Sequence, residues 1–171
     1  MFIAAKCVMK IISGGQSGVD RAALDVAIER GISWGGWCPK GGWAEDVPEP
    51  PGLLAKYPNL RETPLSHPLQ RTEWNVRDSD ATLIIVDSEG LSVSIGTKRA
   101  REWANRHGKP LLTIDASEPE ASGRAAAWVQ AQKKRFGPDM TLGIGGPRES
   151  EAPGIYAQAK LLIATMWDRL T

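Results

Sequence analysis

The segment KIISGGQSGVDR, residues 10–21, joins a short apolar stretch to the start of a helical pattern. Ile11 and Ile12 end a predicted buried strand, and an amphipathic helix is predicted over residues 18–30. Three glycines lie within five positions between the two. Because glycine permits positive φ and a close approach of the backbone to another group, this junction favours a ligand site between a strand and a helix.

The rest of the chain repeats this alternation. Strands are predicted over residues 8–12, 32–38, 81–87, 110–114 and 140–144, and further helices over residues 69–77, 95–107, 121–134 and 153–169. Pro153 is expected in the first helical turn, where its missing N–H costs nothing. Residues 39–66 show little periodicity and are predicted to be a functional loop or to carry a short helix. The βαβα order predicts an α/β fold: one Rossmann-like ligand-binding domain over residues 1–171, with a parallel sheet flanked by helices on both faces.

The bulk composition excludes several classes of protein. The 171 residues carry a formal net charge of +1, so no global field favours nucleic acid or an anionic membrane. No apolar run is long enough for a transmembrane helix, and the first residues do not resemble a signal peptide. A cytoplasmic protein without membrane or nucleic-acid partners is therefore expected. Cys7 and Cys38 are expected to be reduced thiols, with Cys38 as a soft ligand or redox thiol as the alternative.

Three predicted strand-to-helix junctions carry small and donor-rich residues. The candidate binding residues there are Gly14, Gly15, Gln16, Ser17, Gly18 and Asp20 in the first junction, Ser94, Gly96, Thr97 and Lys98 in the second, and Arg148, Glu149 and Ser150 in the third. Since the strands are parallel, the three loops lie at one edge of the sheet and form a crevice for an anionic, nucleotide-sized ligand. Gly15 is expected to admit the ligand by close backbone approach, and the first helix to bind its phosphate. The alternative is a set of tight turns and capped helices, with Arg148 paired to a neighbouring glutamate.

Two other segments hold unusual residues for loops. Lys40 lies between Trp37 and Trp43, whose rings can stack on a flat ligand, cover the sheet edge or form a subunit contact. Arg71 and Asn75 are four residues apart and share a helix face, as ligand-binding groups or as part of an ion-paired surface helix.

Seven segments in order along the chain resemble the molybdenum carrier protein family. They are ISGGQSGVDRAALDVAIERGI, GGWCPKGGWAEDV, YPNLRETP, RTEWNVRDSDATLII, IGTKRA, KPLLTID and GPRESEAPGIYAQA. The resemblance implies a Rossmann-like fold, a homo-oligomer, and binding of a small phosphorylated ligand, the molybdenum cofactor (molybdopterin), for storage or transfer without catalysis. It implies that residues 14–18 cradle the phosphate and that Ser94, Gly96 and Thr97 form a second binding loop.

Single motifs also resemble a wider superfamily. SGGQSGVDRAAL is similar to the loop of DNA-processing proteins, but the chain lacks their basic surface. IGTKRA is similar to the PGG-x-GT-x-x-E motif of the lonely-guy phosphoribohydrolases, with Ala100 in place of the glutamate. Two alternatives to a carrier stay open: a nucleotide-binding sensor, or a nucleotide-processing enzyme that uses one carboxylate as acid or base. The candidate carboxylates are Glu45, Asp46, Glu73, Asp78 and Glu149.

Overall fold

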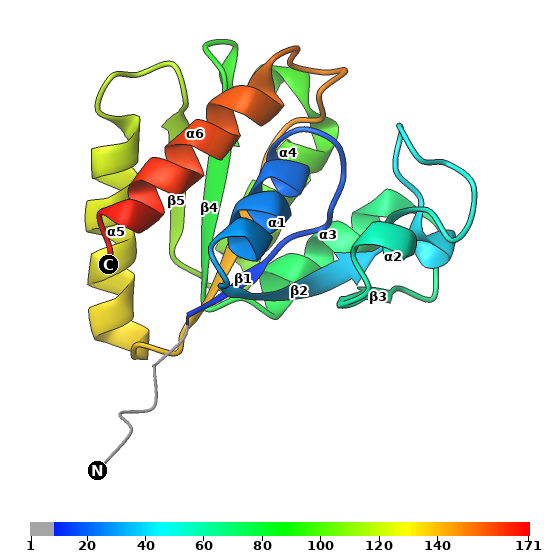
Figure 1. Cartoon of the computed structure of the whole chain (residues 1–171), viewed down its shortest axis with the longest axis horizontal. Coiled ribbons are helices and arrows are strands. Elements are labelled where there is room, and N and C mark those ends of the chain that lie inside the picture. The colour runs from blue at the N-terminus through cyan, green and yellow to red at the C-terminus, as the bar shows by residue number, and fades with distance from the viewer. Residues whose placement is uncertain (1–8) are drawn as a thin grey trace.

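The fold is a parallel sheet covered by helices on both faces (Figure 1), as the sequence predicts. The computed structural model describes residues 9–171. Cys7 and the first position of the predicted strand over residues 8–12 lie outside this range. Within it, no helix combines the length and the apolar character that a membrane span needs.

Six parallel strands form the sheet in the order β3-β2-β1-β6-β4-β5. Their bounds are β1 (Lys10–Ile12), β2 (Ser33–Cys38), β3 (Leu60–Glu62), β4 (Ala81–Val86), β5 (Leu111–Asp115) and β6 (Thr141–Gly145). The central strands β1, β6 and β4 pair in a register that sets Ile12 and Thr82 on either side of Gly143. These three residues share one face of the sheet, because side chains alternate along a strand.

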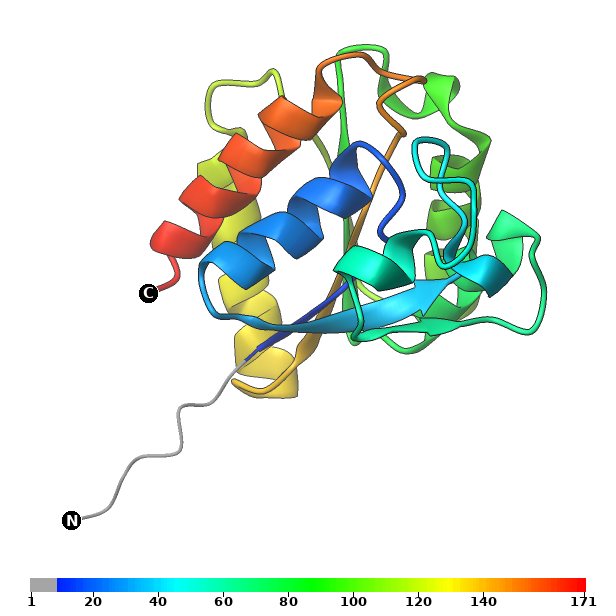
Figure 2. The ribbon, with the colours of Figure 1, turned by 45° about the vertical axis from the view of Figure 1, so that its right-hand side comes forward.

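The helices divide between the two faces. Their bounds are α1 (Val19–Glu29), α2 (Leu53–Lys56), α3 (Pro68–Arg77), α4 (Ile95–Arg106), α5 (Ala121–Phe136) and α6 (Ile155–Asp168), with short 3-10 turns η1 (Lys40–Gly42) and η2 (Gly90–Val93). Helices α1, α5 and α6 cover one face, and α3 and α4 lie together on the other (Figures 1 and 2). The small helix α2 lies beside the β2–β3 edge and packs on Cys38 in a second, smaller core.

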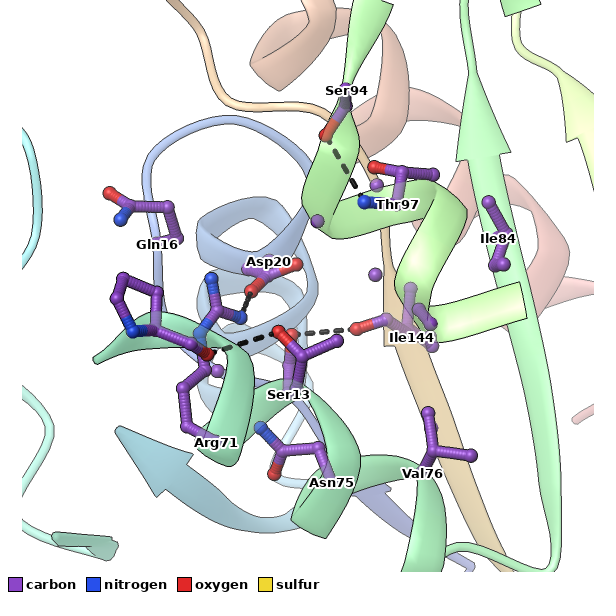
Figure 3. Close-up of a pocket in the computed structure, with 18 of the residues that line it drawn as sticks. Ser13, Gln16, Asp20, Arg71, Asn75, Val76, Ile84, Ser94, Thr97 and Ile144 are labelled. Carbon is purple, nitrogen blue, oxygen red and sulfur yellow. Dashed lines mark hydrogen bonds and ion pairs between the residues drawn. The ribbon is translucent and has the colours of Figure 1, made fainter. Parts of the chain in front are cut away.

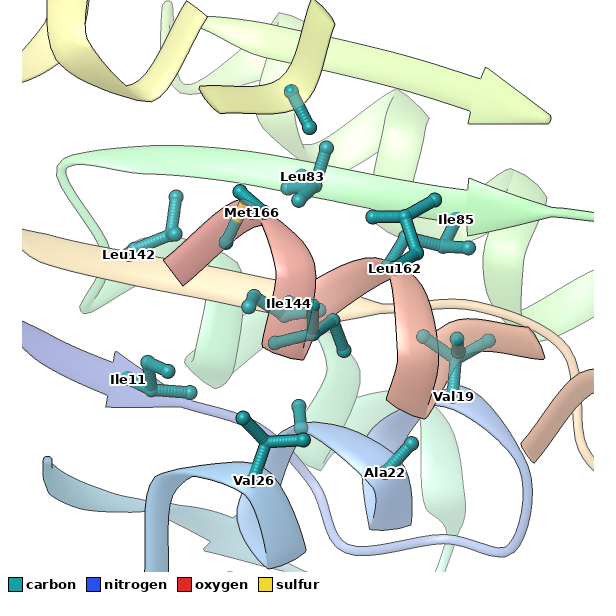
Figure 4. Packing of buried hydrophobic residues seen from close by; sticks show 14 of the residues in the cluster. Ile11, Val19, Ala22, Val26, Leu83, Ile85, Leu142, Ile144, Leu162 and Met166 are labelled. Atoms are coloured by element: carbon teal, nitrogen blue, oxygen red, sulfur yellow. The ribbon is translucent and has the colours of Figure 1, made fainter. Parts of the chain in front are cut away.

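Strand β6 shows why the two faces differ. Its sequence TLGIG places Leu142 and Ile144 on the face of α1 and α6, where both are buried in the main hydrophobic core (Figure 4). The alternate positions are Gly143 and Gly145, which face α3 and α4 and present no side chain. The centre of the sheet is therefore filled on one side and left open on the other.

One prediction needs correction, and one strand was missed. The last helix does not include Pro153: α6 begins at Ile155, and Gly154 at its N-cap has φ 90°. The carboxylate of Glu149 accepts hydrogen bonds from the N–H groups of Gly154 (2.5 Å) and Tyr156 (2.9 Å), so this loop residue caps the helix instead. The edge strand β3 was not predicted, whereas the short helix expected within residues 39–66 is present as α2.

Candidate functional site

A cavity of about 500 Å³ lies between the sheet and the α3–α4 layer (Figure 3). Its volume is within the range of small-molecule sites. Three adjacent strands form its floor, through Ile12, Gly143, Thr82 and Ile84. The loops after β1, β4 and β6 all border it, so the predicted meeting of three junctions at one sheet edge is confirmed.

A buried ion pair crosses the cavity from α1 to α3. Arg71 Nη1 donates to Asp20 Oδ2 at 2.7 Å, and both side chains are largely buried (Figure 3). Burial raises the pKa of the Asp20 carboxyl, while Arg71 and the backbone N–H groups of Gly146 and Gln16 oppose the shift. Gly14 makes room for the pair, since a Cβ there would lie 2.3 Å from Arg71 Nη1.

Three buried polar atoms of the cavity lining have no hydrogen-bond partner among the described residues. They are Thr82 Oγ1 on β4, Thr97 Oγ1 on α4, and Arg71 Nε on α3. Thr82 and Thr97 are only 4% and 3% exposed. An unsatisfied buried group costs about 1–3 kcal/mol, so such groups are uncommon unless something else pairs with them. All three residues border the same cavity, although the three atoms themselves are covered by protein.

The N-terminus of α4 opens into this cavity. Ser94 caps the helix, its Oγ accepting a hydrogen bond from the Thr97 N–H at 3.1 Å (Figure 3). Gly96 also lines the cavity, and a Cβ built there would meet only Ser94 Oγ, at 3.9 Å. The first N–H groups of a helix have no acceptor within the helix and carry a partial positive charge. This end of α4 can therefore receive an anion.

The N-terminus of α1, in contrast, is closed by protein. The Val19 N–H donates to the Pro147 carbonyl at 3.2 Å. A Cβ at Gly18 would lie 2.3 Å from the same carbonyl oxygen, so glycine is needed here for contact with the β6–α6 loop. The first junction thus supplies Gln16 and Asp20 to the cavity lining, while the first N–H of its helix is already used.

A clamp of hydrogen bonds ties together the loops around the site. Gln16 Oε1 accepts from the N–H groups of Ser17 and Glu45, each at 3.0 Å. The Glu45 carboxylate accepts from the hydroxyl groups of Ser17 and Ser150, and Ser17 Oγ accepts from the Glu149 N–H. Partial burial opposes ionisation of Glu45, but the serine hydroxyls hold its pKa below the ordinary value. The loops after β1, β2 and β6 therefore form one assembly.

The sequence-derived candidates separate into two groups. Those that line the cavity are Gly14, Gln16, Asp20, Arg71, Asn75, Ser94, Gly96, Thr97 and Arg148. Those outside its lining are Gly15, Ser17, Gly18, Lys40, Lys98, Glu149 and Ser150. Several of the second group hold the loops in place, and Lys98 is exposed.

Gly15 has a structural reason to be glycine that differs from the expected one. A Cβ there would meet Leu60 at 3.0 Å, Leu53 at 3.3 Å and Leu24 at 3.4 Å. The side of Gly15 from which a side chain would project thus faces the second core. Its φ of +71° also disfavours other residues. The close backbone approach expected for a ligand is made here by leucine side chains.

Two hydrogen bonds join Asn75 and Trp37. Asn75 Oδ1 accepts from the Trp37 N–H at 2.8 Å, and its amide donates to the Trp37 carbonyl at 3.0 Å. The Trp37 indole donates to Asp78 at 2.7 Å and packs edge-on against Trp74. These contacts pack the Trp37 ring against α3 on one face of the sheet.

Sequence reasoning missed part of the lining. Ser13, His67, Thr72, Thr82 and Glu151 border the cavity without having been singled out. Thr82 left a signal, as a hydroxyl residue inside the otherwise apolar strand ATLIIV. None of the acid–base candidates Glu45, Asp46, Glu73, Asp78 and Glu149 lines it; its carboxylates are Asp20 and Glu151.

The described residues offer little for a metal. Burial raises the pKa of the Cys38 thiol to about 11, so this side chain is neutral near pH 7. Across residues 9–171, no three or more His, Cys, Asp or Glu side chains gather in an arrangement that would hold a metal ion.

Comparisons with known proteins agree with this fold. The model of the circularly permutated YpsA SLOG family matches residues 11–167. A crystal structure of a protein from Syntrophus aciditrophicus SB, named "Putative molybdenum carrier protein", is 38% identical over 94% of this chain and 96% of that one. The two structures superpose with a TM-score of 0.79. None of the curated proteins matches the chain.

Proposed function

The chain belongs to the circularly permutated YpsA SLOG family, and from this premise we propose that it is a carrier of a phosphorylated ring compound. The compound we propose is the molybdenum cofactor, stored or handed on without chemical change. The name of the Syntrophus protein supports this ligand, and so does the resemblance of the motifs. The cavity on the α3–α4 face is its proposed site.

The observation that carries the proposal is the polar lining of the cavity, to which the N-terminus of α4 and the side chains of Arg71 and Arg148 contribute. Thr82 Oγ1, Thr97 Oγ1 and Arg71 Nε belong to lining residues and are covered by protein without a hydrogen-bond partner, so rotation of these side chains would let them pair with a polar ligand. A pterin edge carries such donors and acceptors, while the apolar side chains of Val76 and Ile84 can contact the faces of its ring. A purely apolar ligand would leave the three groups unsatisfied.

The phosphate of the ligand is proposed to lie at the N-terminus of α4, near Gly96, with Arg148 as its cation. Gly96 and Arg148 both line the cavity, and a guanidinium group can bind phosphate through two hydrogen bonds. This assignment replaces the phosphate cradle expected at residues 14–18, because the Val19 N–H donates to protein there. The organic part of the cofactor would be held by the protein and would itself carry the metal through its dithiolene group.

Native mass spectrometry of the purified protein, beside fluorescence of oxidised molybdopterin after acid release, tests the proposal. We expect a bound pterin phosphate in the wild-type protein. Arg148→Ala should weaken the binding of oxidised molybdopterin about tenfold through loss of a charge-assisted contact. Lys98→Ala, an exposed cation outside the cavity lining, is the matched control and should bind like the wild type. Equal affinities for the wild-type and Arg148→Ala proteins would remove Arg148 from the site.

One observation favours a second candidate, an enzyme acting on nucleotides. Asp20 and Glu151 line the same cavity, and burial raises the pKa of Asp20, as a general acid requires. Release of free base from a panel of nucleoside monophosphates tests this candidate. Binding of these compounds without turnover would exclude it and leave a carrier or a nucleotide sensor.

The resemblance to the molybdenum carriers extends the proposal to assembly, and the sequence patterns extend it to location. We propose one ligand-binding domain per chain, a homo-oligomer, and a cytoplasmic protein. Sedimentation velocity at several protein concentrations would measure the assembly, and a monomer throughout would contradict it.

A further inference from the structure

A second depression of about 330 Å³ lies beside the cavity, under the loop that follows β2. Its lining is mostly apolar and includes Trp43 and the prolines at positions 48, 50 and 68. Lys40 supplies a cation to the same lining. Neither Trp43 nor Lys40 belongs to the lining of the first cavity. The depression therefore offers an aromatic face and a positive charge that the proposed carrier function leaves unused.

The two hollows share a wall. Pro68, the first residue of α3, lines both of them. Arg148 lines the first cavity, and its guanidinium carbon lies 5.4 Å from the centre of the Trp43 ring, which lines the second. The two hollows are therefore neighbours, and a ligand that extended past Arg148 would reach the Trp43 ring on the side that the guanidinium leaves uncovered.

The loop that carries Trp43 is held by its neighbours. The Gly41 N–H donates to Glu62 at 2.6 Å, and a Cβ at Gly42 would lie only 2.3 Å from the Pro51 carbonyl oxygen. Ala44 is fully buried in the second core, and Glu45 belongs to the clamp between the loops. Residues on both sides of Trp43 are therefore fixed, which favours a preformed stacking surface over a mobile side chain.

We propose that this depression is a second binding subsite, and that the ligand has two planar ring systems joined through phosphate. The inference rests on the proposed function for its first ring and its phosphate. The first ring lies in the α3–α4 cavity, and the linking phosphate lies at Arg148. The second ring stacks on Trp43, and Lys40 attracts the phosphate next to this ring. Stacking is the contact that a tryptophan flanked by prolines can offer to any flat heterocycle.

A matched pair of probes tests the subsite in calorimetric titrations. Guanosine monophosphate has one ring and one phosphate, and diguanosine diphosphate has two rings joined through phosphates. We expect the second probe to bind the wild-type protein about tenfold more tightly, because stacking adds to its affinity. Trp43→Ala should abolish this advantage, and a loss shared by both probes would report the support that the Trp43 ring gives to Arg148. Trp43→Phe, which keeps a ring, should restore most of it and guards against a loss caused by misfolding.

The contribution of Lys40 is tested in the same way. Lys40→Ala should weaken diguanosine diphosphate alone, and Lys134→Ala, an exposed lysine on α5, should have no effect. If the protein binds fluorescent oxidised molybdopterin but binds both guanosine probes equally, or neither, the second subsite is wrong and the carrier proposal stands. If none of the three compounds binds, the carrier proposal fails and this inference fails with it.

Discussion

The same strands form both faces of the sheet, but one face packs against the hydrophobic core and the other borders the cavity. On the α1–α6 face, β4 and β6 contribute Leu83, Ile85, Leu142 and Ile144, and the packing is continuous (Figure 4). On the α3–α4 face the alternate positions include Thr82, Gly143 and Gly145, and a cavity lies above them (Figure 3).

This difference shows which face of the sheet contributes more to the stability of the fold. A fully packed face supplies most of the hydrophobic driving force, since burial of apolar area dominates folding. The other face can then keep unpaired hydroxyl groups and an ion pair that would be costly elsewhere. Substitutions on the packed face should accordingly affect stability first, and those on the open face ligand binding first.

The largest effect is expected from truncation on the packed face. Leu142→Ala should lower the free energy of unfolding by about 3 kcal/mol, because Leu142 is completely buried and its removal leaves a void. The matched control is Leu69→Ala on the wall of the cavity. Since Leu69 is half-buried beside an existing hollow, we expect a loss of about 1 kcal/mol or less. Equal losses in urea denaturation would contradict the comparison.

The next effect comes from the ion pair on the open face. Arg71→Ala should lower the free energy of unfolding by about 2 kcal/mol near pH 7, because Asp20 is left buried without its cation. The pKa of Asp20 is already raised and should rise further in the variant. The folded state then binds the Asp20 proton more tightly than the unfolded state does.

The stability of Arg71→Ala should therefore be greatest below the ordinary Asp pKa of about 3.9 and fall as pH rises through the raised value. Urea denaturation at about pH 4 and about pH 7 measures this slope relative to the wild type. Arg30→Ala is the control, because its pair with Asp168 is at the surface and should contribute little. An Arg71→Ala slope equal to that of Arg30→Ala would refute the role of burial.

Two neighbouring glycines, Gly14 and Gly15, allow the same comparison between stability and binding within one turn. Gly15→Ala should cost about 1.5 kcal/mol of stability, from its positive φ and its contact with Leu60, without changing ligand affinity. Gly31→Ala has a similar φ of +62° and open space around it, so it reports the backbone cost alone. Gly14→Ala should instead displace Arg71 and weaken binding of oxidised molybdopterin about tenfold. Thermal unfolding and titration measure the two effects. A loss of affinity in Gly15→Ala, with unchanged affinity in Gly14→Ala, would contradict these assignments.

The smallest effect on stability is expected at the cavity floor. Thr82→Val keeps the shape of the side chain and removes a hydroxyl that has no protein partner. The free energy of unfolding should change by less than about 1 kcal/mol, while ligand affinity should fall about tenfold through the lost hydrogen bond. Thr113→Val on β5, outside the cavity lining, is the control. Unchanged affinity in Thr82→Val would show that this hydroxyl does not contact the ligand.

Sequence patterns predicted the elements that depend on local periodicity. The run ATLIIV and the segment after the first glycine loop gave β4 and α1 nearly to their observed ends. The short strand β3 escaped because its three residues gain their conformation by pairing with Gly36, Trp37 and Cys38 of β2. A pattern of three residues carries no period, so its structure depends on a partner distant in sequence.

The sequence predicted the edge of the sheet at which the site lies. It predicted only some of the residues that line the site. Parallel strands bring their following loops together, so the glycine and serine junctions pointed to the correct crevice. Which side each residue faces depends on packing. Gly14 faces the ion pair and Gly15 faces three leucines, although both are glycines in one turn.

The sequence by itself determined the alternation of strands and helices, the family, and the edge of the sheet where a ligand is expected. These follow from periodicity and from the conformational freedom of glycine, which are local properties. Only the tertiary structure decided that α1 is closed at its N-terminus by the Pro147 carbonyl and that α4 is open. It also decided which of Ser17, Glu149 and Thr97 have partners, because hydrogen bonds between distant loops depend on their positions in space.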